Sequence, residues 1–463
     1  MILKNRRLQF MLAVLALIFV YEALLFAVSH GRYSVPSADG NGVALRAFPY
    51  PYRCAFTICS DIDGTGSLRE FLVIQEYLNT RNETVLGQGL GLEIGNSFYG
   101  VTKDEQLGFI SQDSVNAEVI SELVGMGYVD VIHSFAYAEG RAEIAKTVQA
   151  LVDRDCRLDV WVNHSRDSSN VGRFSSTRAS SLGDNIGSGV YHTDFSLPQL
   201  GLRFFWIGDV SAIVGQGRPV APAAFFSALD RGHKLDSFYN CSMKELVKFS
   251  AAPFTAKYSA RIHNDLIWPG ELEDGQRVFF FSRCNISHKQ YADVDGLAEN
   301  LRPEVLRALV EAGGYMVVYT HLGMNGGYPY LTEEACRNLE KLAARNREGE
   351  VLVATTGRLL NYYANTKYLN WHSEVDKGGV LICIDSISDP VRGEFVPSPE
   401  ELRGVTFYVK DPRAVHMDIG GKRCRDITMN PADHTGRASV MVPWAPLASA
   451  DSLMSRYKRR GFF

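Results

Sequence analysis

The sequence predicts a distorted parallel (β/α) barrel, with a small all-β domain after it and a membrane-spanning helix before it. Between residues 50 and 368, apolar runs of strand length alternate with segments of helical periodicity, a pattern typical of parallel strands. About seven such runs favour a barrel over an open sheet. After residue 369 the helical pattern stops, and short strands separated by turn residues follow. An apolar run over residues 10–28 predicts the membrane helix.

The N-terminal segment, residues 1–29, is predicted to be a membrane anchor. The basic residues Lys4, Arg6 and Arg7 come first, and only Glu22 interrupts the apolar run that follows. The run is close to the ~20 residues that cross a bilayer, and longer than the ~7–15 of a cleavable signal core. A cleaved signal peptide is the alternative. Both interpretations place the bulk of the chain outside the cytoplasm. The anchor predicts a single-pass protein of the inner membrane whose bulk is periplasmic or extracellular.

The remaining chain divides into a linker over residues 30–49, the barrel over 50–368 with an insertion over 208–275, and a small β-sandwich-like domain over 369–463. The last of these ends in a basic tail, which is expected to be solvated. Barrel strands are expected at 54–60, 129–134, 158–163, 203–207, 278–282, 315–320 and 351–356. Helices are expected at 67–79, 115–125, 141–155, 333–345 and 357–368. The C-terminal strands are expected at 379–384, 405–410, 413–418 and 438–443.

Composition excludes several classes of protein. Hydrophobic residues make up 46% and charged residues 22% of the chain, which is typical of globular proteins. The net charge of −4 without a long basic run argues against nucleic-acid binding. The eight cysteines could form disulfides outside the cytoplasm, but none has the CxxC spacing of a zinc ribbon or thioredoxin motif. Cys59 and Cys383 lie inside apolar strands and are expected to be buried thiols.

The strongest local signal is the segment Asp61-Ile62-Asp63-Gly64-Thr65, directly after the first barrel strand. Two carboxylates this close repel each other unless a cation or a shared proton intervenes. Catalytic groups of parallel barrels lie at the carboxyl ends of the strands. Asp and Gly are also ordinary turn formers, so a turn is the alternative interpretation.

Three histidines stand at equivalent places. His133, His164 and His321 each follow an apolar strand. If the strands form one barrel, these side chains converge on the aspartate pair. Imidazole and carboxylate are the ligands that Zn and similar divalent ions prefer, so the sequence predicts a metal site, with Zn as the expected ion. His192 could join this site or line its pocket.

These motifs resemble the polysaccharide deacetylases with a NodB-homology barrel, carbohydrate esterase family four, over roughly residues 50–368. The resemblance implies that Asp61 is the general base and Asp63 a metal ligand. His133-Ser134 matches the start of the family's second motif, and His321 in VVYTHLG matches its late histidine, the general acid. By this resemblance the substrate is an N- or O-acetylated envelope or extracellular polysaccharide.

The chain departs from the family at its second motif. Position 137 is Tyr where the family has its other histidine, and the Arg-Pro-Tyr motif is missing. A phenol with a pKa of ~10 is a poor Zn ligand at neutral pH. We therefore predict His164 as the replacement ligand, from its position alone. Asn163, Tyr137 and His192 are predicted to contact substrate.

Two other functions fit parts of the sequence. The DIDGT segment also resembles the motif of haloacid-dehalogenase-like phosphatases, in which Asp61 would be the nucleophile. That family needs a later acidic pair, but position 213, four beyond Asp209, is Ile. The loss of the histidine at Tyr137 instead suggests a catalytically decayed barrel that binds glycan or an envelope complex.

Overall fold

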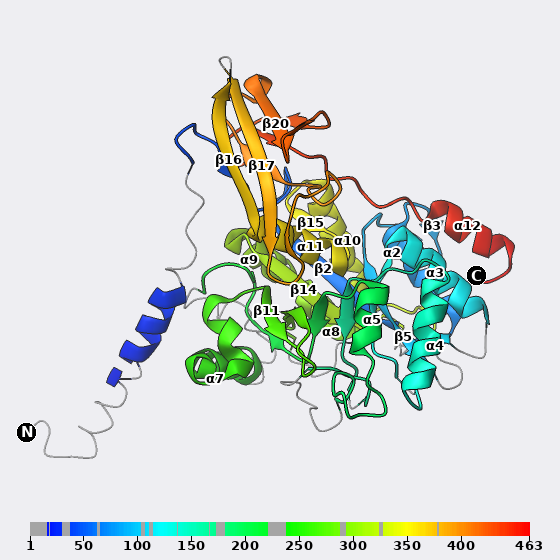
Figure 1. The fold of residues 1–463 in the computed structure, drawn as a ribbon. Helices are drawn as coiled ribbons and strands as arrows, with labels where there is room; N and C mark the ends of the chain where they lie inside the picture. The colour runs from blue at the N-terminus through cyan, green and yellow to red at the C-terminus, as the bar shows by residue number, and fades with distance from the viewer. Residues whose placement is uncertain are drawn as a thin grey trace, which may run out of the picture.

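The computed structural model describes most of the chain. The described residues are 16–17, 19–29, 38–62, 65–102, 107–110, 114–136, 138–165, 167–172, 181–220, 238–287, 293–323, 327–376 and 379–463. Figure 1 shows a main body of strands and helices, with one long hairpin projecting from it and the N-terminal helical segment beside it.

The main sheet has twelve strands and curls into a half-barrel. Its path runs through β10 (Val210–Ser211), β13 (Arg283–Cys284), β14 (Tyr315–Thr320), β2 (Cys54–Asp61), β5 (Gly95–Val101), β7 (Val129–Ile132), β8 (Val160–Val162), β9 (Phe204–Trp206), β12 (Arg277–Phe281) and β11 (Ile267–Glu271). Two further strands lie off this path: β15 (Val351–Val353), which pairs with β2, and β6 (Gly108–Ile110), which pairs with β5. Buried apolar side chains of β2 and β14 lie at the centre of the core.

The predicted fold class is wrong in two respects. First, the sheet is mixed, because β11 runs antiparallel to β12. A tight turn joins them, in which Leu272 N–H bonds to Gln276 O and Gly275 has a φ of +85°. So short a connection can only join antiparallel strands. Pro269 and Gly270 interrupt the apolar pattern of β11, so the sequence did not predict this edge strand.

Second, the expected membrane-spanning helix is not found. Residues 16–17 and 19–29 are helical, and the beginning of the apolar run over 10–28 lies outside the described residues. No helix in the part of the chain that the structure describes is long and apolar enough to cross a membrane.

Helices cover the main sheet where the periodicity predicts them. The five expected helices are α2 (Leu68–Asn79), α3 (Ser114–Met126), α4 (Arg141–Val152), α10 (Glu333–Arg347) and α11 (Thr356–Lys367). Caps fix their starts: Ser67 Oγ accepts from Glu70 N–H, and Thr332 Oγ1 accepts from Ala335 N–H. Further helices are α5 (Thr193–Leu200), α8 (Val294–Asn300) and α9 (Pro303–Ala312). Residues 208–275, predicted as an insertion, supply β10 and β11 to the main sheet. Between these strands, the described residues form η4 (Phe238–Met243), α7 (Lys244–Ala251), η5 (Ala252–Phe254) and η6 (Ala256–His263).

Two smaller sheets are formed mainly by residues after 368, and β1, within the predicted linker, joins one of them by pairing with β19. The first contains β16 (Leu369–Asp376), β17 (Gly379–Asp389), β18 (Gly393–Phe395), β20 (Val415–Ile419) and β21 (Lys422–Cys424). The second contains β1 (Ala44–Leu45), β19 (Thr406–Tyr408), β22 (Thr428–Asn430) and β23 (Ser439–Met441). A short ribbon of β3 (Glu83–Thr84) and β4 (Gly87–Gln88) and the turn η7 (Pro412–Ala414) complete the elements. The hairpin of β16 and β17 is the projection in Figure 1.

The basic tail is a helix that packs on the body. Helix α12 (Asp451–Arg459) lies against α2 and α3, as Figure 1 shows. Lys458 Nζ lies 2.7 Å from Glu76 Oε1, and Arg456 Nη2 lies 2.6 Å from Glu122 Oε2. Acidic partners on the first helices thus hold the end of the chain. The seven described cysteines, Cys54, Cys59, Cys156, Cys284, Cys336, Cys383 and Cys424, are all free thiols.

Candidate active site

Three of the predicted residues meet at the carboxyl ends of β2, β7 and β14. Asp61 is the last residue of β2, His133 directly follows β7, and His321 directly follows β14. His133 Nδ1 lies 3.8 Å from Asp61 Oδ1, and His321 Nε2 lies 4.0 Å from Asp61 Oδ2. The parallel pairing of β2 with β14 and with β5, which in turn pairs with β7, places these three ends together.

Asp61 is buried and held ionised. Its Oδ1 accepts a 2.6 Å hydrogen bond from Ser97 Oγ. Arg283 donates to both carboxylate oxygens, from Nη1 to Oδ2 at 3.2 Å and from Nη2 to Oδ1 at 3.3 Å. Burial alone would raise the pKa of Asp61, but Arg283, followed by His133 and His321, lowers it well below the ordinary value. The carboxylate therefore stays charged at every physiological pH.

Arg283 is the functional residue that the sequence analysis missed. Its side chain is 1% exposed, and its guanidinium carbon lies 4.5 Å from the ring centroid of Trp206 and 4.9 Å from that of Tyr319. Two aromatic faces and a carboxylate together compensate a fully buried cation. Burial lowers the pKa of Arg283, but Asp61 outweighs this effect and raises it. Its sequence signal is a charged residue two positions after a buried apolar run, at the start of β13.

His164 lies beside His133. Their ring centroids are 5.1 Å apart and their planes meet at 87°. The side chain of Asn170 holds the backbone of His164 on both sides, accepting from its N–H at 2.8 Å and donating to its carbonyl at 2.9 Å. Both histidines precede a serine with positive φ, Ser134 at +63° and Ser165 at +35°. Left-handed backbone at non-glycine residues is uncommon and concentrates at functional sites.

The two imidazoles are the part of the predicted ligand set that the structure brings together. Asp63, the predicted carboxylate ligand, and Tyr137 lie outside the described residues. Within the described part of the chain, no three His, Cys, Asp or Glu side chains form a group that could hold a metal ion. The two adjacent imidazoles alone supply part of the ligand set that a divalent ion such as Zn needs.

His192 and Asn163 do not join this cluster. His192 is fully buried, and its ring nitrogens lie 2.8 Å from Ser196 Oγ and 2.8 Å from Ser169 O. Burial lowers its pKa to about 4, so the ring is neutral. Asn163 accepts from Trp161 Nε1 at 2.7 Å and donates to Val171 O at 2.7 Å. Both side chains therefore hold the loop after β8 instead of facing a substrate.

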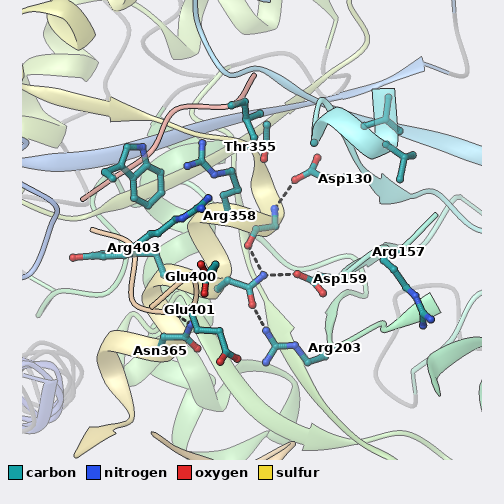
Figure 2. A pocket seen from close by; sticks show the side chains of 18 of the residues that line it. Asp130, Arg157, Asp159, Arg203, Thr355, Arg358, Asn365, Glu400, Glu401 and Arg403 are labelled. Atoms are coloured by element: carbon teal, nitrogen blue, oxygen red, sulfur yellow. Dashed lines mark hydrogen bonds between the residues drawn. The ribbon is translucent and has the colours of Figure 1, made fainter. Parts of the chain in front are cut away.

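A cavity of about 480 Å³ lies at the opposite ends of the strands. Figure 2 shows its wall, to which Asp130, Asp159 and Arg203 contribute at the starts of β7, β8 and β9. Asn361 links two of these residues: it donates to Asp159 and accepts from Arg203. Because the predicted catalytic side chains stand at the carboxyl ends, this large cavity is separate from the candidate active site.

Comparisons with known proteins add no family assignment. No family model, curated protein or solved structure matches this chain. The functional argument therefore rests on the geometry.

The cluster contains groups that can accept and donate protons. An ionised carboxylate can accept a proton or orient an imidazole, and His321 stands within 4.0 Å of it as a second proton carrier. Arg283 sets the charge of the carboxylate through hydrogen bonds to both of its oxygens. Such a cluster suits acyl hydrolysis, in which a proton leaves the attacking water and another reaches the leaving group.

Proposed function

We propose that this protein is a hydrolase that removes acetyl groups from an N- or O-acetylated envelope or extracellular polysaccharide. The observation that carries the proposal is the buried, ionised Asp61 between His133 and His321 at the carboxyl ends of the strands. In this proposal Asp61 accepts the proton of the attacking water, and His321 donates a proton to the leaving amine or alcohol.

The charge that Arg283 imposes on Asp61 shapes this mechanism. A carboxylate with a lowered pKa is always ready to accept a proton but holds it weakly. The proton must then move on, and His321 Nε2, 4.0 Å from Oδ2, is positioned to take it after a small side-chain movement. His321 can then donate this proton to the leaving amine or alcohol.

A divalent ion is part of the proposal. His133 and His164, with Asp63, would hold it. When bound, such an ion lowers the pKa of a coordinated water towards ~7 and offsets the charge that develops on the acetyl carbonyl oxygen. Ser134 and Ser165, in their left-handed conformation, would fix the directions of the two imidazoles.

Location outside the cytoplasm, at the inner membrane, is also a proposal. It is supported by the basic residues Lys4, Arg6 and Arg7 before the apolar run over 10–28. A reporter that is active only outside the cytoplasm, fused after residue 40, should be active. A reporter that works only in the cytoplasm would contradict this location.

The enzymatic proposal is tested by acetate release. The full chain, supplied with Zn²⁺, is incubated with N-acetylated chito-oligosaccharides and with acetylated xylan, and free acetate is measured. The wild type should release acetate from one of these probes, and Asp61→Asn should lose at least 100-fold of the rate, in line with ~10²–10⁴-fold for a lost acid–base group.

The matched control is Asp411→Asn, which makes the same change at the N-cap residue of η7, outside the main sheet. It should keep the wild-type rate. If the wild type releases no acetate from either probe and binds no divalent ion in equilibrium titration, the enzymatic proposal fails. A glycan-binding barrel would then be the better interpretation.

A further inference from the structure

Exposed apolar side chains are concentrated in two short segments. Among the described residues, sixteen large hydrophobic side chains are exposed, and nine of these belong to residues 17–28 and 239–254. The nine are Leu17, Phe19, Val20, Leu24, Val28, Tyr239, Met243, Val247 and Phe254. We call these nine side chains the apolar ridge. Phe19 and Phe254 are 75% and 78% exposed, an unfavourable arrangement in water unless something covers them.

The two segments form one surface. Tyr21 stacks on Phe254 with ring centroids 6.2 Å apart, and its hydroxyl donates a 2.6 Å hydrogen bond to Ser250 O. Phe26 packs on Phe249 at 5.1 Å. Figure 1 shows the N-terminal helical segment beside α7. These contacts join the two segments, and the nine side chains of the ridge stay exposed on them.

We propose that the apolar ridge rests on a lipid bilayer, so that residues 239–254 are a second membrane contact in addition to the N-terminal segment. The sequence favours lipid as the occupant, since the ridge continues the apolar run that begins at residue 10 and is interrupted only by Glu22, and basic residues precede that run. Helix α7 adds Lys244, whose ammonium lies 5.2 Å from the Tyr239 ring. Phe, Tyr and Leu beside Lys are the usual composition of segments that lie in a membrane interface.

The ridge is connected to the candidate active site by buried polar contacts. Glu245 of α7 lies 3.4 Å from Arg261, and Arg261 lies 2.6 Å from Asp209. Trp206 Nε1 donates to Asp209 O at 2.6 Å, and the Trp206 ring covers Arg283. Contact of the ridge with a bilayer would therefore fix the orientation of the Arg283–Asp61 pair relative to the membrane surface.

Photo-crosslinking to lipid tests this inference on the full chain. The crosslinking amino acid p-benzoylphenylalanine replaces Val247 or Phe254, and the protein is reconstituted into vesicles of phosphatidylethanolamine and phosphatidylglycerol that carry a radiolabelled acyl chain. Val396 provides the matched control, because it is the same residue type, is 60% exposed against 61% for Val247, and lies outside the ridge.

Positions 247 and 254 should each give at least fivefold more labelled adduct than position 396. Equal yields at the three positions would overturn the inference. So would crosslinks at 247 and 254 that reach only a protein when the experiment is repeated in native membranes. Acetate release from soluble chito-oligosaccharides is measured separately, so a failure of this inference is distinguishable from a failure of the proposed activity.

Discussion

Replacing Asp130 by asparagine should stabilise the protein above pH 7 and leave its stability almost unchanged near pH 4. Asp130 stands at the start of β7, on the wall of the large cavity. Its Oδ2 accepts a 2.5 Å hydrogen bond from Gly357 N–H, whereas Oδ1 is buried without a hydrogen bond. Burial outweighs the hydrogen bond from Gly357 and raises the pKa of Asp130 from 3.8 to about 7.

The size of the effect follows from the two protonation equilibria. The unfolded chain loses the Asp130 proton near pH ~3.9, and the folded chain keeps it until about 7. The stability present at low pH is thus lost as the pH rises between these values, by ~1.4 kcal/mol per pH unit, and the loss is complete above about 7. Asparagine does not titrate, and its amide oxygen can still accept from Gly357. Between pH 5 and pH 7.5 the variant should gain about 3 kcal/mol relative to wild type.

Urea unfolding at pH 5, 6, 7 and 8, followed by tryptophan fluorescence, measures this difference. The control is Asp411→Asn, because Arg413 lowers the pKa of the exposed Asp411, so its difference from wild type should not grow across this range. A difference between Asp130→Asn and wild type that is constant from pH 5 to pH 8 would refute the reasoning. Lower stability of the variant at pH 8 would refute it equally.

Three further substitutions, at Arg283, His192 and Gly95, test how buried groups affect stability. Arg283→Met should cost about 3–5 kcal/mol in urea unfolding because it leaves Asp61 charged and buried, and adding Asp61→Asn should recover part of this loss. Because the folded His192 ring resists protonation, the wild type should lose stability as the pH falls from ~6.5 to about 4. His192→Gln should abolish this loss. Curves of stability against pH that are the same for the variant and the wild type would contradict the prediction. Gly95→Ala would place a Cβ 2.6 Å from Asp130 Oδ1 and should lower the unfolding free energy by about 1–3 kcal/mol; a neutral result would show that Asp130 can move aside.

Local periodicity predicted most of the main sheet and its helices. Each expected barrel strand and each expected helix overlaps an observed element, because apolar spacing reports directly which face an element buries. Strand β5 was missed since its sequence, GNSFYGV, holds polar residues although every position is buried. Asn96 is accommodated there by hydrogen bonds to Gln75 and to Tyr128 O, partners that no local pattern reveals.

The order of the strands predicted only part of the candidate site. The strand-end rule placed Asp61, His133 and His321 correctly beside one another, because their strands are close neighbours in a parallel part of the sheet. The same rule does not predict the direction in which a side chain points. His192 also follows a loop near the strand ends, yet its ring turns inward to Ser169 and Ser196.

Arg283 shows what a physical argument could have added. Arg283 comes directly after the apolar run VFFFS, and a guanidinium buried there needs a carboxylate. Asp61 also follows a buried strand, and a cation is one of the two ways to relieve its repulsion from Asp63. Arg283 and Asp61 therefore supply each other's counter-charge, although 222 positions separate them in the sequence. If charged residues at strand ends are first paired with residues of opposite charge, and only then assigned to a metal, Arg283 is placed in the site. Asp61 then has a permanent counter-charge without a metal ion.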